Sequence, residues 1–168
     1  DVGCWVGFLM AEARERGWQP LGVEPSAFAA RYARERLSLE VIEGDFFEED
    51  LREQRFNAVV MGDVLEHLTR AGAALDRAAG LLSPDGVLVL QLPDAGSLVA
   101  RALGRRWWSV IPTHVHYFTR GSITALLARH GFAPVHIGTD PKAFTVGYYL
   151  DKGGGYAPGL ARRLVRGA

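Results

Sequence analysis

The chain has 168 residues, of which 19 are basic and 19 acidic, and 48% are hydrophobic, so it can bury the core of one domain. The balanced charge excludes an overall field that attracts nucleic acid or anionic lipid, and the apolar runs fall far short of the roughly 20 residues that cross a bilayer. Because the chain contains a single cysteine, Cys4, and no cleavable signal pattern, we expect a cytoplasmic protein with a small-molecule partner, and neither a nucleic-acid nor a membrane partner.

The chain opens on a glycine turn between an expected strand end and a helix. Asp1, Gly3 and Gly7 frame this turn, and residues 8–16 follow as a helix that Gly17 ends. Turns of this kind hold nucleotide-like ligands, because their backbone amides approach the ligand closely. Since Asp1 stands so near the turn, we expect that most of the first strand of the fold is missing from this sequence.

Strands and helices alternate in the next part of the chain. Strands are expected at residues 20–23, 39–42, 56–61 and 87–92, and helices at 27–37 and 71–82, with the turn residues 83–86 before the last strand. Strands that are apolar on both faces and alternate with helices predict a parallel sheet covered on both sides and joined by right-handed crossovers. The predicted fold class is therefore α/β, with a doubly wound, mostly parallel sheet.

The second half of the chain is less regular. It predicts a short helix at 96–104, an amphipathic helix at 121–130, a strand at 134–137 and a surface helix at 160–166, whereas periodicity cannot decide between strand and helix at 144–150. Within a single domain over residues 1–168, we expect a cofactor-binding half at 1–95, an acceptor-side half at 96–140 and an irregular segment at 141–168. Whether the last strand of the fold is present is left open by the sequence.

Acidic residues follow three of the expected strands. Glu24 lies about twenty residues after the glycine turn, at the position that accepts hydrogen bonds from ribose hydroxyls. Asp45 could accept from an exocyclic amine such as that of adenine, with Phe46 packed on the ring, and Asp63 ends the next strand. Glu24 could also act as an acid at a helix N-terminus, and Asp45 as a plain turn residue.

These motifs resemble those of class I S-adenosylmethionine-dependent methyltransferases. The matching segments, in chain order, are DVGCWVG (1–7), GVEPS (22–26), EGD (43–45), DVLEHL (63–68) and LSPDGVL (82–88). The segment PTHVHYFT (112–119), followed by a helix, is similar to the small-molecule branch that includes ubiquinone-type O-methyltransferases and methyltransferases of sugar and polysaccharide pathways. The resemblance implies a Rossmann-like methyltransferase fold and S-adenosylmethionine as cofactor.

The resemblance also implies roles for individual residues. Gly3 and Gly7 would let the backbone approach the methionine part of the cofactor, and Asp1 would orient its amino group. Glu24 would bind the ribose, Asp45 and the backbone of Phe46 would read the adenine, and Asp63 and Val64 would line the sulfonium side. The implied function is transfer of a methyl group to a small molecule, with an oxygen of a glycosyl or quinone-like metabolite as the favoured acceptor.

The acceptor side offers histidines but no clear metal site. His114 and His116 are candidate general bases in a loop that could fold over the sheet edge, although they could equally belong to a hydrogen-bonded structural loop. Asp63, Glu66 and His67 could coordinate a divalent ion. A cluster of this kind at a helix start is more often a cap with a hydrogen-bonded histidine, so we expect no metal.

Trp5 departs from the pattern of the family, which prefers glycine at this place. An indole that points inward would shade the methionine pocket, and a catalytically degenerate cofactor-binding or scaffolding domain of the same fold is therefore one alternative. A nicotinamide-dependent dehydrogenase is a second. It is disfavoured because the glycine spacing does not fit that fingerprint and because a dehydrogenase gives no reason for Asp45.

Overall fold

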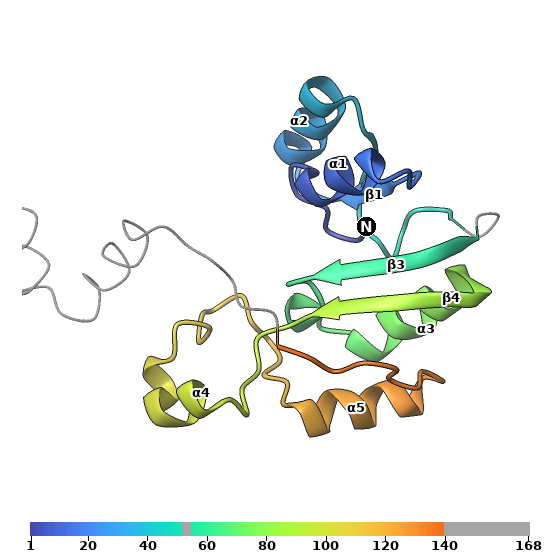
Figure 1. The fold of residues 1–168 in the computed structure, drawn as a ribbon. Helices are drawn as coiled ribbons and strands as arrows, with labels where there is room; N and C mark the ends of the chain where they lie inside the picture. Colours follow the sequence, from blue (N-terminus) through green and yellow to red (C-terminus); the bar gives the residue numbers. More distant parts are fainter. Residues whose placement is uncertain (52–54, 140–168) are drawn as a thin grey trace, which may run out of the picture. The chain divides into compact units, whose positions relative to one another are not determined.

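The computed structural model describes residues 1–51 and 55–139 (Figure 1). The chain divides into two compact units, Asp1–Val135 and His136–Ala168. The described part of the second unit is residues 136–139. The elements expected at 144–150 and 160–166, and the irregular segment expected at 141–168, lie outside the described residues.

A parallel sheet forms the centre of the first unit. Its strands are β1 (Leu21–Glu24) paired with β2 (Glu40–Glu43), and β3 (Phe56–Gly62) paired with β4 (Leu82–Gln91), each pair being parallel. Val2 stands between the two pairs and makes parallel bridges to Val23 of β1 and Met61 of β3. The order across the sheet is therefore β2, β1, Val2, β3, β4.

The order of the strands changes direction at Val2. The chain leaves the middle of the sheet there, adds β1 and β2 on one side, and returns to add β3 and β4 on the other. The Val2 N–H donates to the Val60 carbonyl at 2.9 Å, and the Gly3 N–H donates to the Val23 carbonyl at 2.8 Å. This arrangement confirms the predicted doubly wound sheet. Open sheets of this kind bind ligands where the strand order changes direction, outside the carboxyl ends of the strands.

Helices cover the two faces of the sheet. α1 (Phe8–Glu15) and α2 (Ala27–Leu37) share one buried cluster, formed by Cys4, Met10, Ala30, Ala33, Leu39 and Val41. α3 (Ala71–Leu81), which lies behind β3 and β4 in Figure 1, packs Ala74, Leu75 and Ala78 into a second cluster with Val23, Val59 and Met61. Neighbouring residues of one strand point to opposite faces, so the two clusters lie on opposite sides of the sheet.

Two expectations differ from the structure. β4 begins at Leu82, because the expected turn residues 83–86 form an irregularity within it: the pairing with β3 jumps from Phe56–Leu82 to Ala58–Val87. The strand expected at 134–137 is wrong, since the described residues there form no strand. Val135 is 95% exposed and therefore lacks the packing that a strand requires.

The remaining elements follow β4 in the chain. They are α4 (Leu98–Leu103), the 3₁₀ helix η2 (Gly104–Arg106) and α5 (Arg120–Arg129). α5 starts at a capping box in which the Thr119 side chain accepts from the Ser122 N–H, while the Ser122 side chain accepts from the Thr119 N–H. None of the helices in residues 1–51 and 55–139 has the length and apolar character needed to cross a bilayer.

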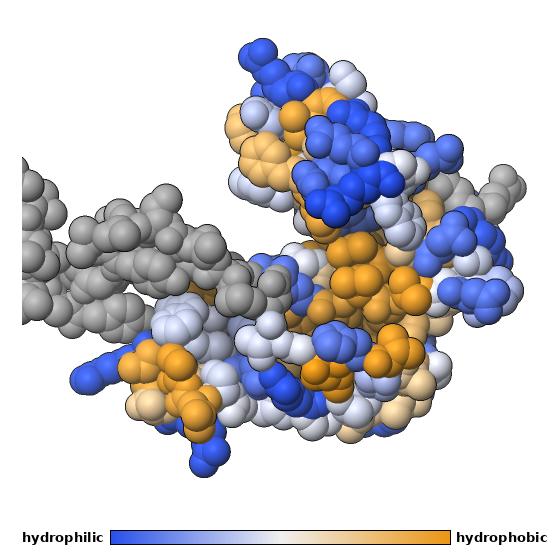
Figure 2. Space-filling model, viewed as in Figure 1, coloured by the Kyte–Doolittle hydropathy of each residue, from blue (hydrophilic) through white to orange (hydrophobic). Residues whose placement is uncertain are grey.

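One face of the β3–β4 pair carries exposed apolar side chains. Leu88 and Leu90 pack on the α3 side, whereas Val87 and Val89 point the other way and are each 47% exposed. Figure 2, in the same view as Figure 1, shows hydrophobic residues gathered over β3 and β4.

Candidate functional site

Two glycines let the backbone of the turn pack closely against neighbouring side chains. Gly3 and Gly7 have φ angles of 67° and 84°, in the left-handed region that favours glycine. A Cβ atom at Gly3 would lie 2.7 Å from Cγ2 of Val64, and one at Gly7 would lie 2.6 Å from Cδ1 of Leu39. The turn is therefore pressed against the end of β3 on one side and against the α2–β2 connection on the other.

Trp5 adopts a left-handed conformation within this turn although it is not glycine. Its φ angle is 50°. Its side chain is 58% exposed, so the indole is not wedged among the buried residues of the domain. Its peptide N–H points back into the fold and donates to Oε2 of Glu24 at 2.8 Å.

Glu24 ends β1 and is only 5% exposed. Its Oε2 accepts from the Trp5 N–H, and its Oε1 accepts from the Ser26 N–H at 2.9 Å. The carboxylate therefore ties the glycine turn to the start of α2, whose N-cap is Ser26. A carboxylate has about four acceptor positions, and these two hydrogen bonds use two of them.

Asp45 and Phe46 follow β2. Oδ1 of Asp45 accepts from the Phe47 N–H at 2.7 Å, which is the turn role that the sequence left open. The Phe46 ring is 5% exposed, belongs to the core cluster on the α3 side and has the Arg77 guanidinium 5.0 Å from its centroid. The backbone of Phe46, rather than its ring, is thus what this residue can offer to an adenine.

Asp63 follows β3 in a left-handed conformation, with a φ angle of 54°. Its N–H donates to the carbonyl of Gln91, the last residue of β4, at 2.9 Å. Strained backbone of this kind in a non-glycine residue is concentrated at functional sites. Since the strands are parallel, Glu24, Asp45, Asp63 and the glycine turn all lie at one edge of the sheet.

The histidine loop at residues 112–119 is fastened to this edge. It contacts the 3₁₀ helix η1 (Leu65–His67), which follows Val64 directly. The Glu66 carbonyl accepts from the N–H groups of Val115 at 3.0 Å and His116 at 3.1 Å, and Nδ1 of His67 lies 2.9 Å from the Thr113 carbonyl. The loop is therefore anchored on the residues that follow the end of β3.

The two candidate bases have different environments. The His114 ring lies 4.6 Å from that of His67, centroid to centroid, and burial together with the neighbouring His67 lowers the pKa of His114. His116 packs on Phe118 with the ring centroids 5.4 Å apart. Its Nε2 is buried and has no hydrogen-bond partner among the described residues. His114 is the candidate whose ring contacts η1, next to the carboxyl end of β3.

The adjacent residues Trp107 and Trp108 differ in burial. Trp107 is 6% exposed and belongs to the interior, whereas Trp108 is 57% exposed, with the ring centroids 6.4 Å apart. The Trp108 ring is thus the one exposed to solvent.

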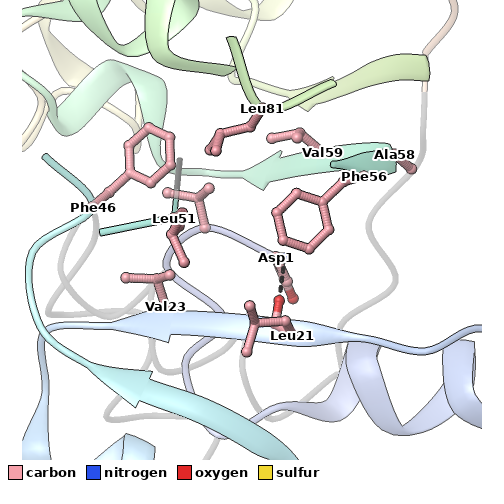
Figure 3. Close-up of a pocket in the computed structure, with 10 residues that line it drawn as sticks. Asp1, Leu21, Val23, Phe46, Leu51, Phe56, Ala58, Val59 and Leu81 are labelled. Atoms are coloured by element: carbon pink, nitrogen blue, oxygen red, sulfur yellow. Dashed lines mark hydrogen bonds between the residues drawn. The ribbon is translucent and has the colours of Figure 1, made fainter. Parts of the chain in front are cut away.

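A small cavity of about 30 Å³ lies away from this edge (Figure 3). Its lining includes Asp1 and the first residues of β1 and β3, Leu21 and Phe56, so it lies toward the amino ends of the strands. The amino group of Asp1 donates to the Leu21 carbonyl there at 2.8 Å. Ligand pockets usually enclose about 300 Å³ or more, so this cavity is a packing gap.

Sequence reasoning missed one feature of the site. Glu66 is 2% exposed, and its neighbour His67 meets a loop 46 residues further along the chain. No local pattern in the sequence signals this meeting, because it depends on where the loop returns to the sheet.

We expect Cys4 to be unreactive in the folded protein. The residue is 6% exposed, and burial, with the charge of Glu24 nearby, raises the pKa of its thiol to about 11. The thiolate is the reactive form, so an aromatic disulfide reagent at pH 8 should label the native chain far more slowly than the urea-unfolded chain. Equal labelling rates in the two states would contradict this assignment.

Three comparisons with known proteins bear on this site. Residues 1–137 match the model of a methyltransferase domain family. The ubiquinone biosynthesis O-methyltransferase of Rhodopseudomonas palustris (strain TIE-1) is 29% identical over 140 residues, which cover 77% of this chain and 54% of that protein. That of Bradyrhizobium sp. (strain ORS 278) is 38% identical over 95 residues, covering 54% of this chain and 37% of that protein.

A solved structure shares the fold. The structure of an S-adenosylmethionine-dependent methyltransferase from Thermotoga maritima superposes with a TM-score of 0.67 at 22% sequence identity, covering 79% of this chain and 62% of that one. The chain spans about half the length of the curated relatives it matches over 140 residues.

Proposed function

Since the chain belongs to the methyltransferase domain family and has the Rossmann-like fold of class I S-adenosylmethionine-dependent methyltransferases, we propose that it transfers a methyl group from S-adenosylmethionine to an oxygen atom of a small molecule. The observation that carries this proposal is the close approach of Gly3 to Val64. It brings the glycine turn and the end of β3 together at the reversal of the sheet, where a ligand of this kind is held.

The residues at the edge fit the cofactor. The turn has no side chain at Gly3 or Gly7, and a Cβ at either position would overlap a neighbour. We propose that Gly3 and Gly7, with Asp1, border the methionine part, that Glu24 binds the ribose, and that Asp45 and the Phe46 backbone read the adenine. Asp63 and Val64 would then line the sulfonium side.

S-adenosylmethionine supplies a methyl group made electrophilic by the sulfonium charge. The work left to the chain is to hold the acceptor in line with that methyl group and to help the acceptor hydroxyl lose its proton. We propose that His114 assists this proton loss, because its ring contacts η1, the helix that directly follows Asp63 and Val64. We propose that His116 supports the loop. In this proposal residues 1–95 hold the cofactor and residues 96–140 face the acceptor.

A quinone-like phenol is the favoured acceptor, because the matched relatives are ubiquinone biosynthesis O-methyltransferases. A glycosyl hydroxyl is the second class. A degenerate domain would require the Trp5 indole to obstruct the turn, which the comparison of the wild type with Trp5→Gly below tests. Membership of the methyltransferase family leaves no support for a nicotinamide-dependent dehydrogenase.

Isothermal titration calorimetry with S-adenosylhomocysteine tests the proposal. We expect one saturable site in the wild-type chain, and at least equal affinity in Trp5→Gly, because glycine adopts a positive φ without strain and carries no indole. The absence of binding heat in both proteins would refute the proposal. Transfer of a labelled methyl group to a phenol, but not to a sugar hydroxyl, would then assign the quinone-like class.

A further inference from the structure

Two arginines at α3 contact the loop that follows β2, in which Asp45 and the Phe46 backbone would read the adenine. Cζ of Arg77 lies 5.0 Å from the centroid of the Phe46 ring. Cζ of Arg70, at the N-cap of α3, lies 4.4 Å from the centroid of the Phe47 ring. Both distances are within about 6 Å, the reach of a cation–π contact. α3 therefore meets two consecutive aromatic rings of this loop.

The Arg77 side chain also holds a second point of the loop. Its guanidinium donates a hydrogen bond to the peptide carbonyl of Glu49. The N–H groups of Glu48 and Glu49 donate to the Asp45 carbonyl, at 2.9 and 3.2 Å respectively, so residues 45–49 form a closed turn. One arginine thus contacts this turn both at the Phe46 ring near its start and at the carbonyl of its last residue.

The burial of Phe46 leaves its backbone as the part that a ligand can reach. The ring is 5% exposed and belongs to the core cluster that includes Leu75 and Ala78 of α3. A shift of this ring would also shift the Phe46 peptide groups, because ring and peptide share one Cα atom. The contacts with α3 and Arg77 therefore hold the Phe46 backbone in one orientation.

Stability alone is a weak reason for an arginine at this position. Arg77 is half-buried, and its Nε atom is buried without a hydrogen-bond partner among the residues that the structure describes. A buried donor that lacks a partner lowers stability, so an apolar side chain would fill the same space with a smaller loss. The guanidinium instead supplies what an apolar side chain lacks, a directed, charge-assisted hydrogen bond to the backbone of the loop.

We propose that Arg77 is a positioning residue for adenine recognition. It holds residues 45–49 so that the Asp45 carboxylate can accept from the exocyclic amine while the Phe46 backbone reads the ring. Arg70 is exposed, and an exposed cation–π contact contributes less than one shielded from water, so Arg70 has little part in this. The inference rests on the proposed function, because it concerns the adenine end of the same site.

Two ligands that differ at one purine position test this role. S-adenosylhomocysteine carries the exocyclic amine, and S-inosylhomocysteine carries an oxygen in its place. The wild-type chain should prefer the first by about tenfold or more in calorimetry, because the second lacks the hydrogen bond to a charged acceptor. In Arg77→Met, which keeps an apolar stem, affinity for S-adenosylhomocysteine should fall by about tenfold and affinity for S-inosylhomocysteine by less than about threefold.

Three further variants separate positioning from stability. Arg77→Lys keeps a charge and a donor, so its preference for S-adenosylhomocysteine should lie between those of the wild type and Arg77→Met, and it decides the matter if Arg77→Met does not fold. Arg70→Met makes the same change at the exposed arginine and should stay within about twofold of the wild-type preference. Gly17→Ala lowers stability between α1 and β1, away from the loop, and should keep the full preference.

The outcomes distinguish this inference from the proposed function. Equal losses of affinity for the two ligands in Arg77→Met would indicate a merely structural role and overturn the inference. Wild-type affinity in Arg77→Met, an equal loss of preference in Arg70→Met, or no preference in the wild type would overturn it as well, and each would leave the proposed methyl transfer standing. A wild-type chain that binds neither ligand would refute both.

Discussion

Replacing Gly7 by alanine is expected to lower the free energy of unfolding by about 2–5 kcal/mol. The residue has a φ angle of 84°, and the added Cβ would lie 2.6 Å from Cδ1 of Leu39 and 3.2 Å from Cβ of Ala33. A left-handed L-residue costs about 1–2 kcal/mol, and overpacking a buried cluster costs about 1–3 kcal/mol more. Urea unfolding followed by circular dichroism measures the sum.

Gly17→Ala is the matched control for this substitution. Gly17 has a φ angle of 87°, but no atom lies within 4 Å of the position of the added Cβ. It should therefore show the backbone cost alone, about 1–2 kcal/mol. An equal decrease in the free energy of unfolding in the two variants would mean that the contact with Leu39 and Ala33 contributes nothing. That result would contradict the tight packing of the turn.

Glu24→Gln is expected to impair both folding and cofactor binding. The glutamine amide has one acceptor oxygen, so either the Trp5 N–H or the Ser26 N–H would face an NH₂ group. A buried donor left without its acceptor costs about 1–3 kcal/mol. If Glu24 also binds the ribose, affinity for S-adenosylhomocysteine should fall by about tenfold or more, since a hydrogen bond to a charged group contributes about 1.5–3 kcal/mol.

Glu43→Gln at the end of β2 provides the comparison. Glu43 pairs with Arg34 at 3.0 Å, and the two side chains are 44% and 40% exposed. Exposed ion pairs contribute about 0–1 kcal/mol, so unfolding should change little and binding of S-adenosylhomocysteine should not change. Similar losses at Glu24 and Glu43 would contradict the assignment of a buried anchoring role to Glu24.

The sheet and its acidic edge could be predicted because their causes are local. Apolar runs bounded by turn residues marked β1, β2 and β3 to within two residues at each end. Parallel pairing then places Glu24, Asp45 and Asp63 at one edge, since each follows the carboxyl end of its strand. The early start of β4 was not predictable, because the residues at 83–86 have the chemistry of a turn even where they sit within a strand.

The contact between η1 and the histidine loop could not be predicted because its cause is not local. The Glu66 carbonyl accepts from two amides of a loop that follows β4 and α4 in the sequence. The strand expected at 134–137 failed for a related reason. A short apolar run becomes a strand only where tertiary structure gives it a neighbour, and Val135 is 95% exposed.

The short path from the glycine turn to the histidine loop bears on how the affinities for two ligands are coupled. Gly3 lies against Val64, η1 begins at the next residue, and the Glu66 carbonyl holds the amides of Val115 and His116. We therefore expect a ligand that rigidifies the turn to rigidify the loop as well, through residues 64–66. Any resulting change in affinity must be reciprocal: a methyl donor that tightens the binding of the acceptor is itself bound more tightly, by the same factor, when the acceptor is present.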